Sequence, residues 1–191
     1  ATGARASEVL AAAADEALRT SPELAGELFD AAVRAGGVEV TARHAQAAAL
    51  AGDSGRALRL ADETLAASTT TAADRRRAVS VTAAVLAQRG FAGRTAELYL
   101  TLGDADALLA VPALLATGDL DRAREALATA PPSEHDAPTL TAPAVRLLAT
   151  GLLATVDGDL PTALSDLTRA AELLEPAGEA VLLPYLSLIH I

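Results

Sequence analysis

One turn signal recurs along this chain and constrains its fold more than any other feature. A glycine ends one predicted helix and opens the next. The four clear instances begin at Gly52, Gly90, Gly118 and Gly158, and a weaker one begins at Thr20. The intervals between the five starts are 32, 38, 28 and 40 residues, a mean of 34.5. This spacing is typical of a helical-hairpin repeat, so we predict an all-α chain, an α-solenoid of antiparallel helix hairpins.

A small residue follows each of these turns about five positions later. The residues are Ala25, Ala57, Thr95 with Ala96, Ala123 and Ala163. Small side chains are needed where two helices cross closely, and a turn glycine can take the positive φ that reverses the chain. The pattern therefore predicts helices that pack tightly on either side of each turn.

The best-formed repeat spans residues 141–176. Gly151 lies seven positions before Gly158, Leu167 lies nine after it, Ala170 lies twelve after it, and Pro176 closes the unit. Small residues at the crossing and a large apolar residue that fills the next layer resemble a tetratricopeptide repeat. The other units hold Ala45 and Ala83 at the small position and Tyr99 and Leu127 at the large one, but Val111 and Thr95 depart from the pattern. We therefore expect degenerate copies.

Gly, Pro and capping residues between apolar stretches of helical spacing give the element boundaries. The predicted helices lie near residues 4–19, 22–35, 39–51, 54–67, 72–89, 92–102, 105–117, 119–130, 141–157 and 160–175, and another begins near Glu179. Ser21 is predicted to cap the second helix, with Pro22 at its first position. Four acidic residues at turns are also read as helix caps rather than functional acids: Asp53, Asp104, Asp119 and Asp159. Residues 68–71 and 131–139 lack helical character.

Composition restricts the class of partner. Alanine supplies about a quarter of the 191 residues, all 15 basic residues are arginine, and lysine, asparagine and cysteine are absent. This bias suggests a GC-rich genome, and the missing cysteine fits a cytoplasmic protein. The net charge of −10 opposes direct contact with nucleic acid or an anionic membrane, and no apolar run reaches the roughly 20 residues that a membrane helix needs.

No stretch of the sequence predicts chemistry. Residues 90–95 (GFAGRT) are the nearest approach to a nucleotide-binding loop, but the spacing is too short and arginine stands in place of lysine. His44 and His135 are too far apart in sequence to suggest a metal site, and His190 lies in the last six residues. We assign no catalytic, cofactor-binding or metal-binding residue, and we expect a protein that is not an enzyme.

Three charged stretches have a structural explanation as well as a functional one. Asp157 and Asp159 flank Gly158 like a short acidic metal motif, but helix capping is favoured. Residues 134–136 (EHD) form a polar cluster that could contact a partner or simply be solvated. Residues 75–77 (RRR) spread over most of a helical turn, which favours a solvated face over a phosphate contact.

The two ends of the sequence suggest a fragment. Residues 186–191 (LSLIHI) are the translation of a transposon end used to tag sequencing libraries, and the chain opens without methionine. We therefore expect residues 1–185 to form a tetratricopeptide-like repeat domain truncated at both ends, followed by an adapter scar.

Three stretches carry a more specific resemblance: residues 47–53 (AAALAGD), 114–123 (LLATGDLDRA) and 167–176 (LTRAAELLEP), continued by residues 182–184 (LLP). They resemble the helical-repeat region of large ATP-binding, MalT-like LuxR-family transcriptional regulators of actinobacteria. The resemblance implies an ATPase before the repeats and a helix-turn-helix domain after them, so ATP is expected only in an upstream domain. It also implies a protein or small-molecule effector and self-association, but no functional residue can be carried over.

Two other interpretations stay open. The repeats could belong to another multidomain bacterial protein, such as an antibiotic-pathway regulator with its DNA-binding domain in front or a cyclase with an ATPase. The chain could also be an enzyme or a self-contained helical domain. The domains encoded on either side separate the first two interpretations, and turnover by the isolated chain would support the third.

Overall fold

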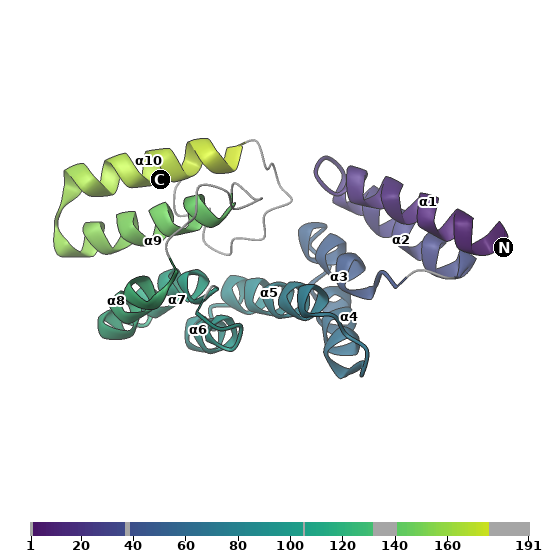
Figure 1. The fold of residues 1–191 in the computed structure, drawn as a ribbon, viewed down its shortest axis with the longest axis horizontal. Coiled ribbons are helices and arrows are strands. Elements are labelled where there is room, and N and C mark those ends of the chain that lie inside the picture. Colours follow the sequence, from purple (N-terminus) through teal and green to yellow (C-terminus); the bar gives the residue numbers. More distant parts are fainter. Residues whose placement is uncertain (1, 37–38, 105, 132–140, 176–191) are drawn as a thin grey trace. The chain divides into compact units, whose positions relative to one another are not determined.

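The computed structural model of the chain describes residues 2–36, 39–104, 106–131 and 141–175, which form an all-α structure (Figure 1). No strand occurs among these residues. Their helices are α1 (Thr2–Ala17), α2 (Pro22–Ala35), α3 (Thr41–Leu50), α4 (Ser54–Ala66), α5 (Ala72–Gln88), α6 (Ala92–Leu100), the 3-10 helix η1 (Ala107–Ala110), α7 (Val111–Ala116), α8 (Leu120–Thr129), α9 (Thr141–Asp157) and α10 (Leu160–Leu174). Their bounds agree with most of the predicted helices to within about two residues.

The described residues fall into two compact units. The first extends to Val85 and holds α1 to α4 with most of α5, and the second begins at Leu86 and holds α6 to α10. In the first unit α1 packs against α2 and α3 against α4, and in the second α7 packs against α8 and α9 against α10. Because each pair is joined by a short turn, each is an antiparallel hairpin.

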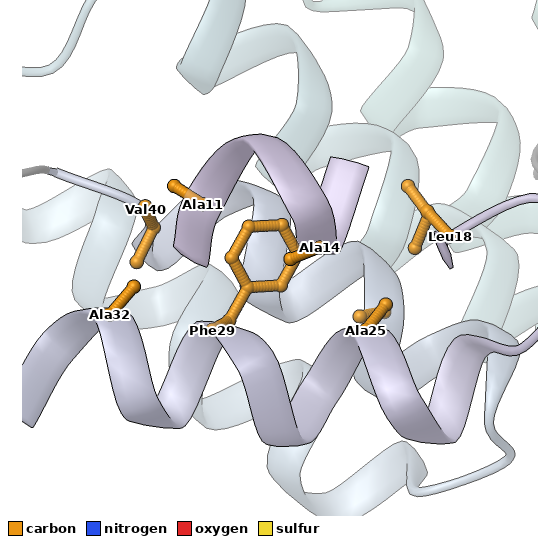
Figure 2. Packing of buried hydrophobic residues seen from close by; sticks show 8 residues of the cluster. Ala11, Ala14, Leu18, Ala25, Phe29, Ala32 and Val40 are labelled. Atoms are coloured by element: carbon orange, nitrogen blue, oxygen red, sulfur yellow. The ribbon is translucent and has the colours of Figure 1, made fainter. Parts of the chain in front are cut away.

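Alanine lines the core of the first hairpin. Phe29 of α2 is fully buried and is directed toward Ala11 and Ala14 of α1 (Figure 2). The rest of this cluster is Leu18, Ala25, Ala32, Val40 and Ala47. One large ring among methyl groups fills the space that small side chains leave, and the small side chains let the helices approach.

A second alanine-rich cluster joins α3, α4 and α5. It consists of Ala45, Ala48, Ala57, Ala61, Ala78, Val81 and Val85. None of these side chains is larger than valine, so the apolar area buried per residue is modest and the close approach of the helices carries the packing.

The second unit has the same construction around two closely packed hairpins. Tyr99, Val111 and Leu114 are its largest fully buried side chains. At the crossing of α9 and α10, a Cβ added to Gly151 would lie 2.7 Å from Leu167 Cγ and 3.2 Å from the Leu167 backbone nitrogen. Glycine is needed here because no other residue leaves room for the facing helix.

The predicted turn glycines all adopt the left-handed conformation. The φ angles of Gly52, Gly90, Gly118 and Gly158 lie between 78° and 81°. At each turn the residue after the glycine donates its backbone N–H to the carbonyl five residues earlier, and the glycine N–H donates to the carbonyl three residues earlier. This is the Schellman ending of a helix, repeated four times with one geometry.

Three of these turns also cap the following helix. Asp53, Asp119 and Asp159 accept hydrogen bonds from the backbone N–H groups of Arg56, Arg122 and Thr162 at 2.9, 3.3 and 3.2 Å. The capping prediction is therefore confirmed for these aspartates. At the fourth turn Phe91 takes the same position with no side-chain capping bond.

The residues predicted to be small and buried occupy the helix interfaces. Ala25, Ala57, Thr95, Ala96, Ala123, Ala163, Ala45, Ala83 and Ala170 are all buried. Tyr99 at the large position is fully buried, whereas Leu127 and Leu167 are half-buried. Val111 is fully buried despite its bulk.

One predicted helix and one predicted cap were wrong. Residues 105–117 are not one α-helix: η1 precedes α7, since Pro112 has no N–H to donate to the Leu108 carbonyl and the α-helical ladder cannot extend back through it. Asp104 accordingly caps no helix, and Asp106 precedes η1 without a capping bond. Ser21 is confirmed as the N-cap residue of α2, with Pro22 at the first helical position, although the Ser21 hydroxyl makes no capping bond.

The segment predicted to lack helix at residues 68–71 is confirmed. The predicted helix near Glu179, the closing Pro176 and nearly all of the segment at 131–139 lie outside the described residues.

Candidate functional site

A buried histidine is the most unusual polar group of the first unit. His44 lies in α3, whose other buried residues are all alanine, and its side chain is 4% exposed. Its ring lies 5.9 Å from the Phe29 ring at a tilt of 34°. The imidazole thus takes the place of a core side chain between α2 and α3.

One carboxylate oxygen faces both this histidine and an arginine. Asp30 Oδ1 accepts a hydrogen bond from Arg56 Nη2 at 2.5 Å and lies 3.8 Å from His44 Nε2. His44 Nε2 is buried and has no hydrogen-bond partner. Three helices, α2, α3 and α4, therefore meet at a single oxygen atom.

The electrostatics of this cluster favour a neutral imidazole. Burial lowers the pKa of His44, and the Arg56 guanidinium lowers it further, while Asp30 opposes both. The hydrogen bond from Arg56 holds the pKa of Asp30 below its usual range. At neutral pH the cluster consequently holds one ion pair, Asp30 with Arg56, beside an uncharged ring.

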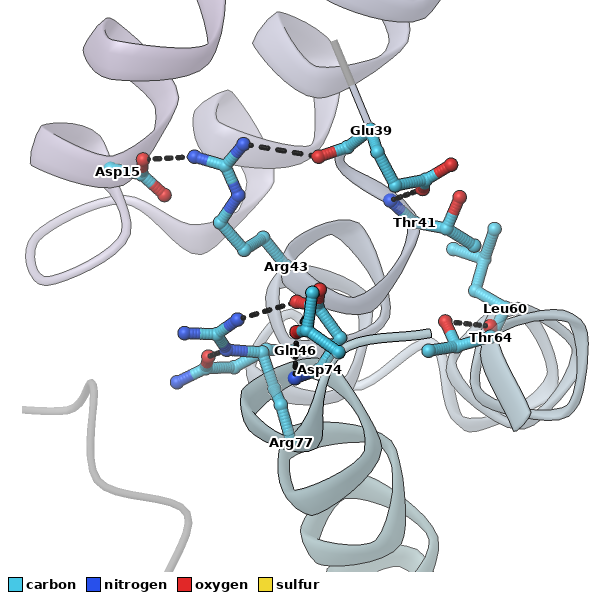
Figure 3. Close-up of polar contacts among 10 residues, drawn as sticks. Asp15, Glu39, Thr41, Arg43, Gln46, Leu60, Thr64, Asp74 and Arg77 are labelled. Atoms are coloured by element: carbon cyan, nitrogen blue, oxygen red, sulfur yellow. Dashed lines mark hydrogen bonds and ion pairs between the residues drawn. The ribbon is translucent and has the colours of Figure 1, made fainter. Parts of the chain in front are cut away.

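Arg43 of α3 contacts Phe29, which packs against His44, and also binds Asp15 of α1. Its guanidinium lies 5.7 Å from the centre of the Phe29 ring and donates to Asp15 of α1 at 2.5 Å and to the Glu39 carbonyl at 3.3 Å (Figure 3). A cation over an aromatic face is stabilised by the ring quadrupole. This contact ties α3 to α1 and α2.

The second unit has a pocket of about 250 Å³ at its surface. Its lining comes from α6, the segment before η1, η1 itself and α8: Leu100, Gly103, Asp104, Ala107, Arg122, Glu125, Ala126 and Thr129. Arg122 donates to Glu97 at 2.8 Å, which lowers the pKa of Glu97 and raises the pKa of Arg122. The Arg122 guanidinium is already paired with Glu97, and the pocket is lined by both acidic and basic side chains. The pocket therefore does not indicate a particular ligand.

The motifs singled out in the sequence have structural roles where they are described. Residues 90–95 form a hairpin turn, and the Thr95 hydroxyl donates to the Phe91 carbonyl at 3.1 Å. Asp159 caps α10, while Asp157 pairs with Arg124 at 2.6 Å. Both stretches therefore have a role in the turns and helix ends.

In the run of arginines at residues 75–77, one side chain is half-buried and two are exposed. Arg77 binds Gln46 of α3 and Asp74 (Figure 3), while Arg75 and Arg76 are exposed. His135 with its acidic neighbours and His190 lie outside the described residues.

Within the described part of the chain, no group of three His, Cys, Asp or Glu residues is placed to hold a metal ion. No helix there combines the length and apolar character that a bilayer crossing requires.

The sequence prediction missed the group formed by Asp30, His44 and Arg56. In the sequence His44 is assessed only as a metal ligand, and its neighbour Asp30 lies on another helix. A usable signal was present: His44 is a lone titratable ring among the alanines of an interface stripe. A polar residue within a stripe of buried alanines on one helix face is expected to be buried with them.

The fold and these sites define an all-helical protein built from antiparallel hairpins with a buried histidine at one interhelical junction. Comparisons of the chain with protein-family models, with curated proteins and with solved structures found no significant match.

Proposed function

We propose that this chain is a protein-interaction and signal-sensing repeat arm of a LuxR-family helix-turn-helix regulator. In this proposal the arm is an α-solenoid of tetratricopeptide-like hairpins, works in the cytoplasm, and couples the binding of a protein or small-molecule effector to an ATPase domain and a DNA-binding domain elsewhere in the protein. The observation that carries the proposal is the fourfold recurrence of one helix-ending turn with a buried small residue about five positions later.

Polar contacts between successive hairpins support the repeat arrangement. Arg43 of α3 reaches Asp15 of α1, 28 residues earlier, and Arg56 of α4 reaches Asp30 of α2, 26 residues earlier. In the second unit Arg122 reaches Glu97, 25 residues earlier. A stack of similar hairpins brings residues about one repeat apart into contact, so these separations fit a solenoid.

Coupling in such an arm follows from its nearest-neighbour construction. Each hairpin is held by the hairpins beside it, so a change at one interface alters the next. An effector shifts the arm only if it binds one arrangement more tightly than another. The assignment to a regulator rests on the resemblance of residues 47–53, 114–123 and 167–176, which is an argument by analogy.

Reading the source DNA through both ends of the frame tests this proposal. We expect a nucleotide-binding loop upstream and a helix-turn-helix domain downstream, with residues 186–191 replaced by genomic sequence. A DNA-binding or cyclase domain in front would instead favour the alternative, a repeat scaffold of another multidomain signalling protein. A frame that closes soon after Tyr185 and encodes no further domain on either side would contradict both.

A further inference from the structure

The buried imidazole of His44 faces a carboxylate, Asp30, that already accepts a hydrogen bond from Arg56. Its Nε2 has no hydrogen-bond partner, and Asp30 Oδ1, at 3.8 Å, is held by Arg56 at 2.5 Å. An unpaired buried polar atom is costly, and proteins seldom retain one without a role. Here the orphaned atom lies within reach of an ion pair that links α2 to α4.

The charged groups that act on the imidazole come from α2 and α4. From α2, Asp30 attracts a charged imidazole, and Arg34 acts on Asp30. From α4, Arg56 repels a charged imidazole.

The remaining charges near α3 are engaged elsewhere. Arg43, on the same helix as His44, is paired with Asp15 of α1. Arg77 of α5 is paired with Asp74. The balance at His44 is thus set by one carboxylate and one guanidinium that already bind each other.

We propose that His44 makes the junction of α2, α3 and α4 acid-sensitive: once protonated, its Nε2–H competes with Arg56 for Asp30 Oδ1 and weakens the link between α2 and α4. A buried imidazolium beside Arg56 is unfavourable while the Asp30 oxygen is taken. The strain is relieved when Arg56 leaves or when the junction opens and hydrates the ring. Both routes separate α4 from α2.

The direction of the pH effect follows from proton linkage. The pKa of His44 in the folded chain is lowered from its ordinary value of 6.5, so the unfolded or opened form binds the proton more readily. The stability that the neutral ring supports is fully present above pH 6.5 and is lost as the pH falls below 6.5 toward the lowered pKa. Acidification therefore opens the junction.

NMR of the full 191-residue chain tests this device. Between about pH 7.5 and about pH 5, where histidine titrates, we expect the imidazole of His44 to titrate below 6.5. Amide signals in α2, α3 and α4 should shift with the same midpoint, and their hydrogen-exchange protection factors should fall several-fold, while those of α9 and α10 stay constant. His44→Gln identifies the His44 resonance and should abolish the coupled changes.

Arg56→Gln separates a switch from a merely structural histidine. Without the guanidinium, Asp30 is free to pair with the imidazolium, so the His44 midpoint should rise and the acid-induced loss of protection should shrink. Arg122→Gln is the matched control, because Arg122 holds the equivalent position after Gly118 and pairs with Glu97 in the second unit. It should leave the His44 midpoint unchanged.

Two results would overturn the proposal. One is a His44 midpoint at or above 6.5 in the unmodified chain. The other is a titration that leaves the amides of α2 and α4 unmoved. Neither result depends on the identity of an upstream or downstream domain. The proposal of an acid-sensitive junction can therefore be wrong while the regulator assignment is right, and the regulator assignment can be wrong while the junction is acid-sensitive.

Discussion

At the residue scale, Gly151 offers the sharpest test of the packing. Alanine favours a helix interior over glycine by about 1 kcal/mol, yet a Cβ at this position would lie 2.7 Å from Leu167 Cγ. Overpacking costs about 1–3 kcal/mol, so Gly151→Ala should lower the free energy of unfolding in spite of its better helix propensity. Urea denaturation followed by circular dichroism measures the change.

Gly26 is the control for this substitution. It lies in α2, and a Cβ there would meet nothing within 4 Å. Gly26→Ala should raise stability by about 0.5–1 kcal/mol, since only the propensity remains. If the two alanine variants move stability in the same direction, the close crossing of α9 and α10 is not what requires glycine.

At the element scale, the repeated turn combines a helix end with a helix start. Asp119 follows the left-handed Gly118 and accepts the Arg122 N–H, whereas Phe91 takes the corresponding place after Gly90 and is 52% exposed. The backbone angles of the two residues are similar, with φ of −86° at both and ψ of 70° and 55°. The position therefore accepts a capping side chain at both turns.

Exchange at these two positions tests the capping argument. Asp119→Ala should lower the free energy of unfolding by about 1 kcal/mol, because an N–H of the first turn of α8 loses its acceptor. Phe91→Asp should raise it by up to about 1 kcal/mol, because α6 gains the cap that the other turns have. Thermal unfolding of the two variants against the parent chain measures both, and a Phe91→Asp variant less stable than the parent would show that the exposed ring is held by contacts rather than tolerated.

The turns could be predicted from the sequence because their chemistry is local. A glycine with positive φ, the aspartate after it and a small residue five positions later are all set within one or two helical turns. The junction of Asp30, His44 and Arg56 could not be predicted this way, since its ion pair joins residues 26 positions apart and depends on how two hairpins stack. The split between η1 and α7 is within reach of the same local reasoning, because Pro112 stands in the sequence and lacks the N–H that a continuous helix needs.

At the scale of the whole molecule, exposed apolar side chains favour the self-association that the repeat arm is expected to show. Leu160 and Leu164 lie one turn apart on α10 and are 66% and 72% exposed, and Val156 near the end of α9 is 50% exposed. A hairpin that presents such residues removes them from water by packing against another hairpin, as neighbouring repeats do in a solenoid. A second copy of the chain can supply that hairpin.

Changing both leucines to glutamine tests this expectation. Sedimentation of the parent chain should show a mass that rises with protein concentration, and Leu160→Gln combined with Leu164→Gln should shift the distribution toward monomer. Val9→Gln with Val33→Gln is the matched control, since these residues are 63% and 55% exposed on the first hairpin, where they lie on separate helices. Because the four side chains are exposed, neither double variant should lose helicity.

A parent chain that stays monomeric at all concentrations and unfolds in one sharp calorimetric transition would contradict the expectation of self-association. A repeat arm with an uncovered apolar hairpin should be only marginally stable on its own.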